Sequence, residues 1–251
     1  MLLILVRETK NVIVSHKYKF IFVHIPKNAG VSLENVLVPM TGELDYVTDS
    51  RRHSQLVSER EKNSEYNVVN AQLRNSKEQD GGYWQHGTIL DICSAVGKEE
   101  LNKYLKFAFV RNPWDRSVSY YRFLCQLDLY GPVDPSKAPS FREWILSDET
   151  SLNPHGPVWW QLRFKKKSQL EWLCDEKGEL MVDFIGKYEN LQRDFETVMQ
   201  KLNLPCVKLP HMNSLKPEDY RSYYDSETRE KVGEWFKRDV ELFNYSFWDR
   251  R

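Results

Sequence analysis

Three segments of the chain share one local design: a short apolar run, a tight turn and then a helical pattern. The apolar runs cover residues 20–25, 106–110 and 181–185. A run that is apolar at successive positions suits a strand buried on both faces of a sheet, and a strand followed by a helix suits the crossover unit of parallel strands. The repetition therefore predicts an α/β fold with a central, mainly parallel sheet flanked by helices.

The turns between these strands and helices carry recognisable start signals. Pro113 suits the first position of a helix over 114–124, where its missing N–H costs nothing, and Asn112 can cap that helix. Other helices are expected over 32–37, after Gly186 to about 202, and over 226–243. One apolar face of the third helix is formed by Leu191, Phe195, Val198, Met199 and Leu202.

Composition limits the class of protein. The 251 residues are 41% hydrophobic, which is enough for a substantial core and predicts a single domain over 1–251. Lys and Arg number 36, as do Asp and Glu, so the formal charge is zero. Binding that wraps nucleic acid needs a cationic surplus, so no nucleic-acid partner is expected, whereas a local anion pocket stays compatible with this balance.

Cysteines and the N-terminus indicate a cellular setting. The 4 cysteines have no paired C-x-x-C spacing, so they are predicted to be reduced and mostly buried rather than zinc ligands or disulfides. The N-terminal apolar run ends at Arg7 and is shorter than a secretory or membrane-spanning segment. We therefore expect a soluble, cytoplasmic protein without a membrane partner.

The segment HIPKNAGVS (24–32) is the first candidate site, between a buried strand and a helix. Such a turn presents free backbone N–H groups and the positive end of a helix dipole. Lys27 adds a charge, Ser32 a hydroxyl, and Gly30 lets a ligand approach the backbone, which together make a phosphate or sulfate cradle. The segment lacks the Walker A glycine pattern. An ordinary turn with a solvated lysine explains these residues equally well.

A second candidate site begins where the apolar run 106–110 ends. Arg111 follows that run, and Ser119 stands eight residues further on, about two helical turns away. Their guanidinium and hydroxyl could clamp a second anionic group at the carboxyl edge of the sheet. The alternative is an ion pair between Arg111 and Asp115 at the helix start.

Together, FIFVHIPKNAGVSL (20–33) and FAFVRNPWDRSVSYYRFL (107–124) resemble the sulfotransferases that use 3′-phosphoadenosine 5′-phosphosulfate (PAPS). The likeness is greater to the branch that contains carbohydrate 2-O-sulfotransferases and short soluble bacterial relatives, and it continues through 178–195 and 209–230. The resemblance implies a P-loop-like nucleotide-binding fold, PAPS as donor, 3′-phosphoadenosine 5′-phosphate (PAP) as product, and no metal.

Site residues follow from matching positions. Lys27 is implied to contact the bridging oxygen of the sulfate, while Arg111 and Ser119 are implied to hold the 3′-phosphate. The loop for the 5′-phosphosulfate would be formed by Asn28, Ala29, Gly30, Val31 and Ser32. Asn28 stands where the family has Thr or Ser, and Val31 where it has Thr. The missing hydroxyl at 31 removes a hydrogen bond worth about 1 kcal/mol.

Two further residues complete the implied site. His86 resembles the family's catalytic base, and its near-neutral pKa suits proton removal from an acceptor. A structural or helix-capping histidine is the alternative. Tyr220 belongs to a C-terminal segment that closes over the nucleotide in the family, where a tyrosine can stack on adenine. The run 165–167 (KKK) is typical of a solvated face, or it could steer anions.

The resulting hypothesis is a PAPS-dependent sulfotransferase. It would transfer the sulfuryl group in line to a hydroxyl or amine of a small-molecule or saccharide acceptor, with His86 as general base and Lys27 stabilising the leaving phosphate. The alternatives are a nucleotide-dependent kinase with a variant phosphate loop and a non-catalytic relative that binds glycans or polyanions. The sequence specifies neither the acceptor nor the oligomeric state.

Overall fold

A computed structural model of the chain divides into two compact units. The sheet unit takes its residues from Met1–Ile25, Ala29–Phe109 and Trp172–Met212, and the helical unit from Pro26–Asn28, Val110–Glu171 and Asn213–Arg251. The single domain expected over 1–251 stays a prediction. The structure describes residues 12–41, 46–47, 87–126, 139–147, 165–210 and 219–249.

Five strands make the sheet, in the order β3-β1-β2-β4-β5. They are β1 (Val12–Ser15), β2 (Phe20–Val23), β3 (Tyr46–Val47), β4 (Leu105–Val110) and β5 (Phe184–Lys187). The two strands that lead into the candidate loops, β2 and β4, pair in parallel, and β1 pairs antiparallel with β2 and β3. The short turn between β1 and β2 leaves no room for a crossover, so an antiparallel hairpin follows. The α/β prediction is confirmed.

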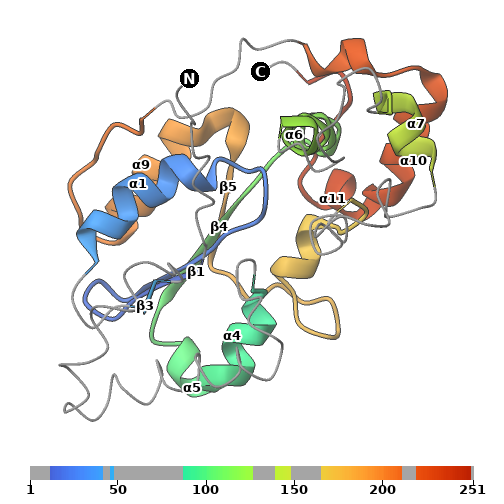
Figure 1. The fold of residues 1–251 in the computed structure, drawn as a ribbon. Coiled ribbons are helices and arrows are strands. Elements are labelled where there is room, and N and C mark those ends of the chain that lie inside the picture. The colour runs from blue at the N-terminus through green and yellow to red at the C-terminus, as the bar shows by residue number, and fades with distance from the viewer. Residues whose placement is uncertain are drawn as a thin grey trace. The chain divides into compact units, whose positions relative to one another are not determined.

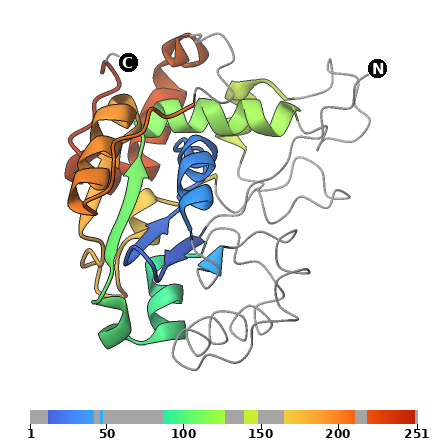
Figure 2. The same cartoon turned by 90° about the vertical axis from the view of Figure 1, so that its left-hand side faces the viewer.

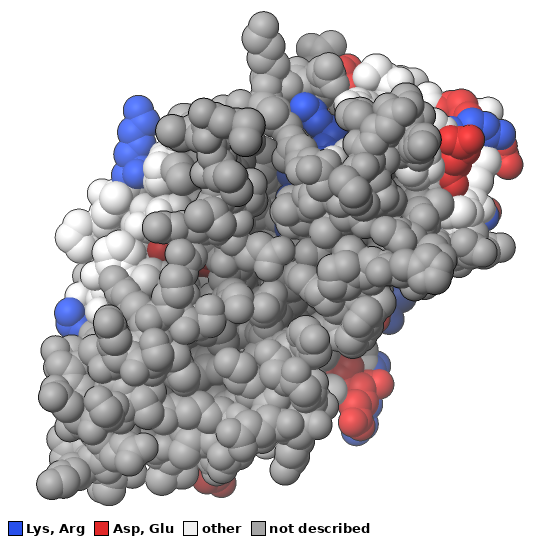
Figure 3. All heavy atoms as spheres, in the orientation of Figure 1, with Lys and Arg blue, Asp and Glu red and all other residues white. Residues whose placement is uncertain are grey.

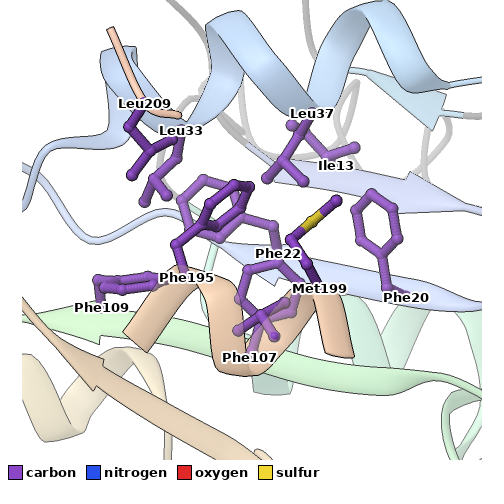
Figure 4. Packing of buried hydrophobic residues seen from close by; sticks show 11 residues of the cluster. Ile13, Phe20, Phe22, Leu33, Leu37, Phe107, Phe109, Phe195, Met199 and Leu209 are labelled. Atoms are coloured by element: carbon purple, nitrogen blue, oxygen red, sulfur yellow. The ribbon is translucent and has the colours of Figure 1, made fainter. Parts of the chain in front are cut away.

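Helices cover the sheet within its unit: α1 (Gly30–Met40), α4 (Ile89–Val96), α5 (Lys98–Leu101) and α9 (Leu191–Lys201). Figures 1 and 2 show α4 and α5 on the side of the sheet away from α1. Alternate strand residues such as Phe20, Phe22 and Phe107 point toward α1 and α9 and form one apolar core with them (Figure 4). That core also includes Ile13, Leu33, Leu37, Phe109, Phe195, Val198, Met199 and Leu209.

The third apolar run is placed differently from its prediction. The expected strand covered 181–185, but β5 is Phe184–Lys187, and Gly186 lies inside it rather than in the turn. A Cβ at Gly186 would overlap the ring of Phe109 on β4, so the close approach of these side chains explains the glycine. The predicted apolar face of α9 is confirmed, because its members lie in the core or pack against it.

The helical unit contains α6 (Pro113–Gln126), α7 (Phe141–Leu146), α10 (Ser226–Trp235) and α11 (Lys237–Leu242). It also contains the short 3₁₀ helices η5 (Tyr220–Tyr223) and η3 (Gln169–Trp172), of which the last residue, Trp172, belongs to the sheet unit. The start of α6 is as predicted: Pro113 is its first residue, and the Asn112 side chain accepts a hydrogen bond from the Trp114 N–H at 3.1 Å. Aromatic side chains pack around Phe141, namely Tyr121, Trp144, Tyr223 and Tyr224.

The predicted C-terminal helix over 226–243 is wrong in one respect, because the chain breaks at Phe236. This residue has φ −112° and ψ 25°, ends α10 and precedes α11. Its side chain is buried, with 2% of its surface exposed, so packing of the ring coincides with the break. Leu242 was expected on the apolar stripe but is 54% exposed.

Two other expectations need correction. All 4 cysteines are free, as predicted, but only Cys174 is buried, and Cys206 is exposed. The run 165–167 is not a uniform solvated face: Lys166 is exposed, whereas Lys165 is buried and its Nζ donates to the Ser147 carbonyl at 2.8 Å. In the part of the chain that the structure describes, no helix has the length and apolar character that crossing a membrane requires.

Surface charge in the helical unit is mixed. Figure 3 shows acidic and basic side chains next to one another over α7 and α10. Arg142 on α7 contributes to this pattern, because it forms ion pairs with Asp225 and Glu227 at the start of α10. This part of the surface therefore has charges of both signs.

Candidate anion-binding site

The loop after β2 has an unusual backbone. Lys27 has φ 71° and Ala29 has φ 64°, both in the left-handed region that residues with a Cβ avoid. Each such residue costs on the order of 1 kcal/mol or more, and persists only where its surroundings hold it. Alternation of left- and right-handed residues turns successive N–H groups to one side and can form an anion-binding concavity. This strained backbone therefore requires contacts from neighbouring residues that hold the loop in place.

Two arginines on the second motif hold the loop by its carbonyl groups. Arg116 Nε donates to the Pro26 oxygen at 3.2 Å, and Arg111 Nη1 donates to the Lys27 oxygen at 3.0 Å. Both guanidinium groups are buried, with 5% and 7% of their residues exposed. Burial lowers the pKa of Arg116 to about 10, against the opposing influence of Asp239. The predicted proximity of the two motifs is present within the helical unit.

Arg111 also forms the ion pair that the sequence left as an alternative. Its Nε lies 2.9 Å from Asp115 Oδ2, and Asp115 is 1% exposed. A buried carboxylate of this kind compensates the charge of the guanidinium and fixes its plane. Arg111 is therefore oriented on one side by Asp115 and bound on the other to the loop. Its predicted contact with a 3′-phosphate stays a prediction.

Lys27 packs against α6 in the helical unit. Its Nζ lies 4.0 Å from the centre of the Phe123 ring, a cation–π contact. Burial, and secondarily the positive charge of Arg111, lower the pKa of Lys27 to about 7. The ammonium group is thus expensive to keep charged here, and an anion placed beside it would favour the charged form.

Ser119 lies on the same side of α6 as these contacts. Arg116, Ser119 and Phe123 stand at spacings of three and four residues, so they share one helical face. Arg116 binds the loop at Pro26, and Phe123 packs on Lys27, so the partly exposed Ser119 shares the face of α6 that contacts this loop. The structure brings Lys27 and Arg111 together, and the predicted phosphate contact of Ser119 stays a prediction.

Gln169 connects the two motifs from a segment outside both. Its Oε1 accepts from Asn28 Nδ2 at 2.8 Å and from the Arg111 N–H at 2.9 Å, and its Nε2 donates to the Arg111 carbonyl at 2.8 Å. Gln169 and Asn28 are buried, at 0% and 2% exposure. Sequence reasoning missed Gln169, and it also missed Arg116 and Phe123. The spacing of the latter two around Ser119 could have revealed them, whereas no local pattern marks Gln169.

In the sheet unit, the continuation of the loop opens α1. Ala29 is the N-cap residue of α1, and its methyl side chain forms no capping hydrogen bond. The N–H groups of the first helical turn are therefore not capped by this side chain, and such groups are the ones that bind anions at a helix N-terminus. Gly30 was expected to admit a ligand, but a Cβ there would overlap the imidazole of His24. That ring is buried and bonded through Nδ1 to Glu34 Oε1 at 2.8 Å, so Gly30 makes room for a side chain that supports the turn.

The remaining loop residues and Tyr220 differ in their exposure to solvent. Val31 is partly exposed, and Ser32 is buried, its N–H donating to the Ala29 carbonyl at 3.0 Å. Tyr220 is 3% exposed and its hydroxyl donates to the Phe247 carbonyl at 2.6 Å, while burial raises its pKa to about 12. The adenine contact of Tyr220 stays a prediction. His86 lies outside the described residues, just before the capping box at Thr88 that starts α4.

The chain is similar to one known protein family over most of its length. The sequence pattern described as "Sulfotransferase family" matches residues 10–246. An uncharacterized protein from the archaeon Archaeoglobus fulgidus is 33% identical over 130 residues, which cover 52% of this chain and 93% of that protein. No solved structure matches the chain.

Two curated relatives have carbohydrate sulfotransferase names. Human carbohydrate sulfotransferase 9 is 24% identical over 96% of this chain, and the match covers 54% of that protein. Xenopus laevis carbohydrate sulfotransferase 12 is 25% identical over 95% of this chain, and the match covers 61% of that protein. The chain therefore spans little more than half the length of these two relatives.

Proposed function

We propose that this chain, which belongs to the sulfotransferase family, transfers a sulfuryl group from PAPS to a hydroxyl or amine of a saccharide or small-molecule acceptor. One observation carries the proposal. A left-handed loop with Lys27 at its centre is held by the guanidinium groups of Arg111 and Arg116, both buried. The strained backbone and the buried ammonium group of Lys27 are both costly for stability alone, and an anionic ligand would account for both.

In this proposal, residues at the positions that match the family hold the two anionic ends of PAPS. Lys27 through Ser32 supply an ammonium group, a hydroxyl and the N-terminus of α1 for the 5′-phosphosulfate. Arg111 and Ser119 would hold the 3′-phosphate. Asn28 and Val31 lack the hydroxyls usual in the family, so the backbone N–H groups carry more of the binding there. Tyr220 would contribute from the C-terminal segment.

The donor, when bound, supplies an activated sulfuryl group. The chain's own residues supply positive charge and a base. Lys27, with a pKa of about 7 before the donor binds, gains its full charge beside an anion and then stabilises charge that develops on the departing phosphate. His86 would remove the proton of the acceptor, because a neutral imidazole is available near pH 7.

A saccharide is the preferred acceptor class. Two relatives that match most of this chain have carbohydrate sulfotransferase names. The acceptor hydroxyl or amine has to reach His86 and the sulfate in line.

The first experiment measures donor binding and transfer separately. PAP should raise the melting temperature of the wild-type protein. Lys27→Met should abolish sulfuryl transfer and weaken PAP binding, because it removes the charge and keeps the aliphatic contact with Phe123. The matched control is Lys237→Met: this lysine on α11 has a 75% exposed side chain and a 3.9 Å contact with Glu241. It should leave both properties unchanged.

Two outcomes would overturn the proposal. Stabilisation by Mg-ATP in preference to PAP would favour a kinase. Binding of PAP or glycans with no turnover, and no effect of His86→Ala on any measured activity, would favour the non-catalytic relative.

A further inference from the structure

We propose that Gln169 is a positioning residue of the donor site, whose buried side-chain amide closes a ring of hydrogen bonds that sets the spacing between the loop at Lys27 and Arg111. The inference rests on the proposed function, since it assigns the ring a role in donor binding. Gln169 belongs to neither motif and stands at the start of η3, 58 positions beyond Arg111 along the chain.

The ring can be followed atom by atom. The Gln169 amide binds both backbone groups of Arg111: Oε1 accepts from the N–H at 2.9 Å and Nε2 donates to the carbonyl at 2.8 Å. The Arg111 side chain then donates to the Lys27 carbonyl at 3.0 Å. Asn28, the next residue, returns to Gln169 Oε1 through Nδ2 at 2.8 Å. A shift of any one member therefore displaces the other two.

The backbone of Arg111 fixes how the two amides are oriented. An N–H can only donate and a carbonyl can only accept, so the end of Gln169 that faces the Arg111 N–H is its oxygen. The same oxygen then requires a donor from Asn28, which its NH₂ group supplies. The direction of every bond in the ring is thus determined without reference to a ligand.

Asp239 of α11 holds the backbone around Gln169. Its carboxylate accepts from the Gln169 N–H at 2.8 Å, from the Leu170 N–H at 3.2 Å, and from the Ser168 hydroxyl. Asp239 is fully buried, and its negative charge opposes the lowering of the Arg116 pKa by burial. These three bonds hold η3 without the Gln169 side chain, which adds only a long contact of 3.5 Å from Nε2 to Asp239 Oδ2. Replacing that side chain should therefore leave η3 in place.

The ring also explains the unusual residue at position 28. The resemblance to the family leads to Thr or Ser there, and Asn28 departs from it. A threonine hydroxyl stands one bond closer to the backbone than the amide nitrogen of asparagine, so it would not reach Gln169 in the same way. Asn28 and Gln169 act as a pair in this chain, and the asparagine contributes to positioning rather than to a direct phosphate contact.

Gln169→Met tests the ring, because methionine keeps the length of the side chain and removes all of its hydrogen bonds. We expect the Kd for PAP to rise at least tenfold. The matched control is Gln192→Met: Gln192 on α9 also ties two segments by its side-chain amide, accepting from the Leu209 N–H at 2.9 Å. It should lose melting temperature to a similar degree and keep its affinity for PAP within twofold.

A second readout requires no donor. With the ring open, Lys27 is free to leave its buried position and to move away from Arg111. Its pKa, followed by NMR of a ¹³C-labelled lysine side chain, should therefore rise from about 7 toward 10.5. The Gln192→Met control should leave it unchanged. Asn28→Ala should reproduce both effects, and the double variant with Gln169→Met should be no worse than either single variant, since a ring opens only once.

The results separate the inference from the proposed function. If Gln169→Met binds PAP within twofold of the wild type, or if the control loses as much affinity, the positioning role is refuted. If the wild type fails to bind PAP, the proposed function is refuted. The ring of hydrogen bonds is then tested by the Lys27 pKa alone, and an unchanged value in both Gln169→Met and Asn28→Ala refutes it. Should Gln169→Met not fold, Asn28→Ala opens the ring from the other side and takes its place in each comparison.

Discussion

The loops that follow β2 and β4 are held in place by different means. The loop after β4 has local support, because Asn112 caps α6 and Pro113 begins it, and the Gln169 amide adds bonds to the Arg111 backbone. The loop after β2 is held from a distance, by Arg111, Arg116 and Gln169, each far from it in sequence. A locally determined turn forms with its helix, whereas the other adopts its shape only when the second motif is in place. The second motif is thus a frame for the first, in addition to any ligand contact of its own.

The largest expected effect comes from breaking that frame at its buried ion pair. Asp115→Ala leaves the Arg111 guanidinium uncompensated in a site where Asp115 was 1% exposed. Loss of one partner of such a pair costs about 3–5 kcal/mol, so urea denaturation should show a decrease of that size in the free energy of unfolding. Arg142→Ala, which removes half-exposed ion pairs, should cost no more than about 1 kcal/mol. Equal losses in the two variants would contradict the framing role of Asp115.

The second prediction concerns pH and the loop after β2. The pKa of Lys27 falls from 10.5 in the unfolded chain to about 7 in the fold, so between these values the unfolded state binds more protons. The free energy of unfolding should therefore rise with pH from about 7 to 10.5, by at most about 1.4 kcal/mol per pH unit from this group. Below pH 7 both states hold the proton, and the contribution becomes constant.

Lys27→Met isolates this contribution. The difference between the wild type and the variant, measured by denaturation at several pH values, cancels the titration of the other groups. The slope should be present in the wild type and reduced in Lys27→Met. A saturating concentration of PAP should flatten it in the wild type, because a bound anion raises the pKa of Lys27. Parallel curves for the two proteins would show that Lys27 titrates normally.

These differences explain what could be predicted from the sequence. Periodicity and local caps depend on neighbouring residues, so the α/β class, the start of α6 at Pro113 and the apolar face of α9 were all predictable. The choice of a distant partner is not encoded in spacing. Gln169 therefore stayed hidden, and so did the overlap that a Cβ at Gly30 would have with the His24 ring. The break at Phe236 was missed for the same reason, because tertiary packing overrides the helical pattern.

A third prediction, with a smaller expected effect, concerns the helix cap in the loop after β4. Asn112→Ala removes the cap that accepts from the Trp114 N–H, and also a bond from its Nδ2 to the Ser246 carbonyl at 2.8 Å. Loss of a cap costs about 1 kcal/mol, so the melting temperature should fall by a few degrees. The pKa of Lys27 should not change, since the frame does not pass through this side chain. A change in that pKa would mean that the two loops are not held separately.

The smallest expected effect concerns two neighbouring positions where α1 begins. Ala29 has φ 64° and ψ 19°, a conformation that glycine adopts without the steric cost of a Cβ. Ala29→Gly should therefore leave the free energy of unfolding unchanged or raise it by up to about 1 kcal/mol, because relief of strain offsets the greater entropy of an unfolded glycine. Gly30→Ala is the matched opposite: it adds one methyl group where the His24 ring stands, and it should destabilise the protein. Urea denaturation of both variants tests this prediction. If Ala29→Gly costs as much as an ordinary Ala→Gly change in a helix, the left-handed backbone at Ala29 is not a source of strain. In that case, the loop needs no distant contacts to hold this conformation.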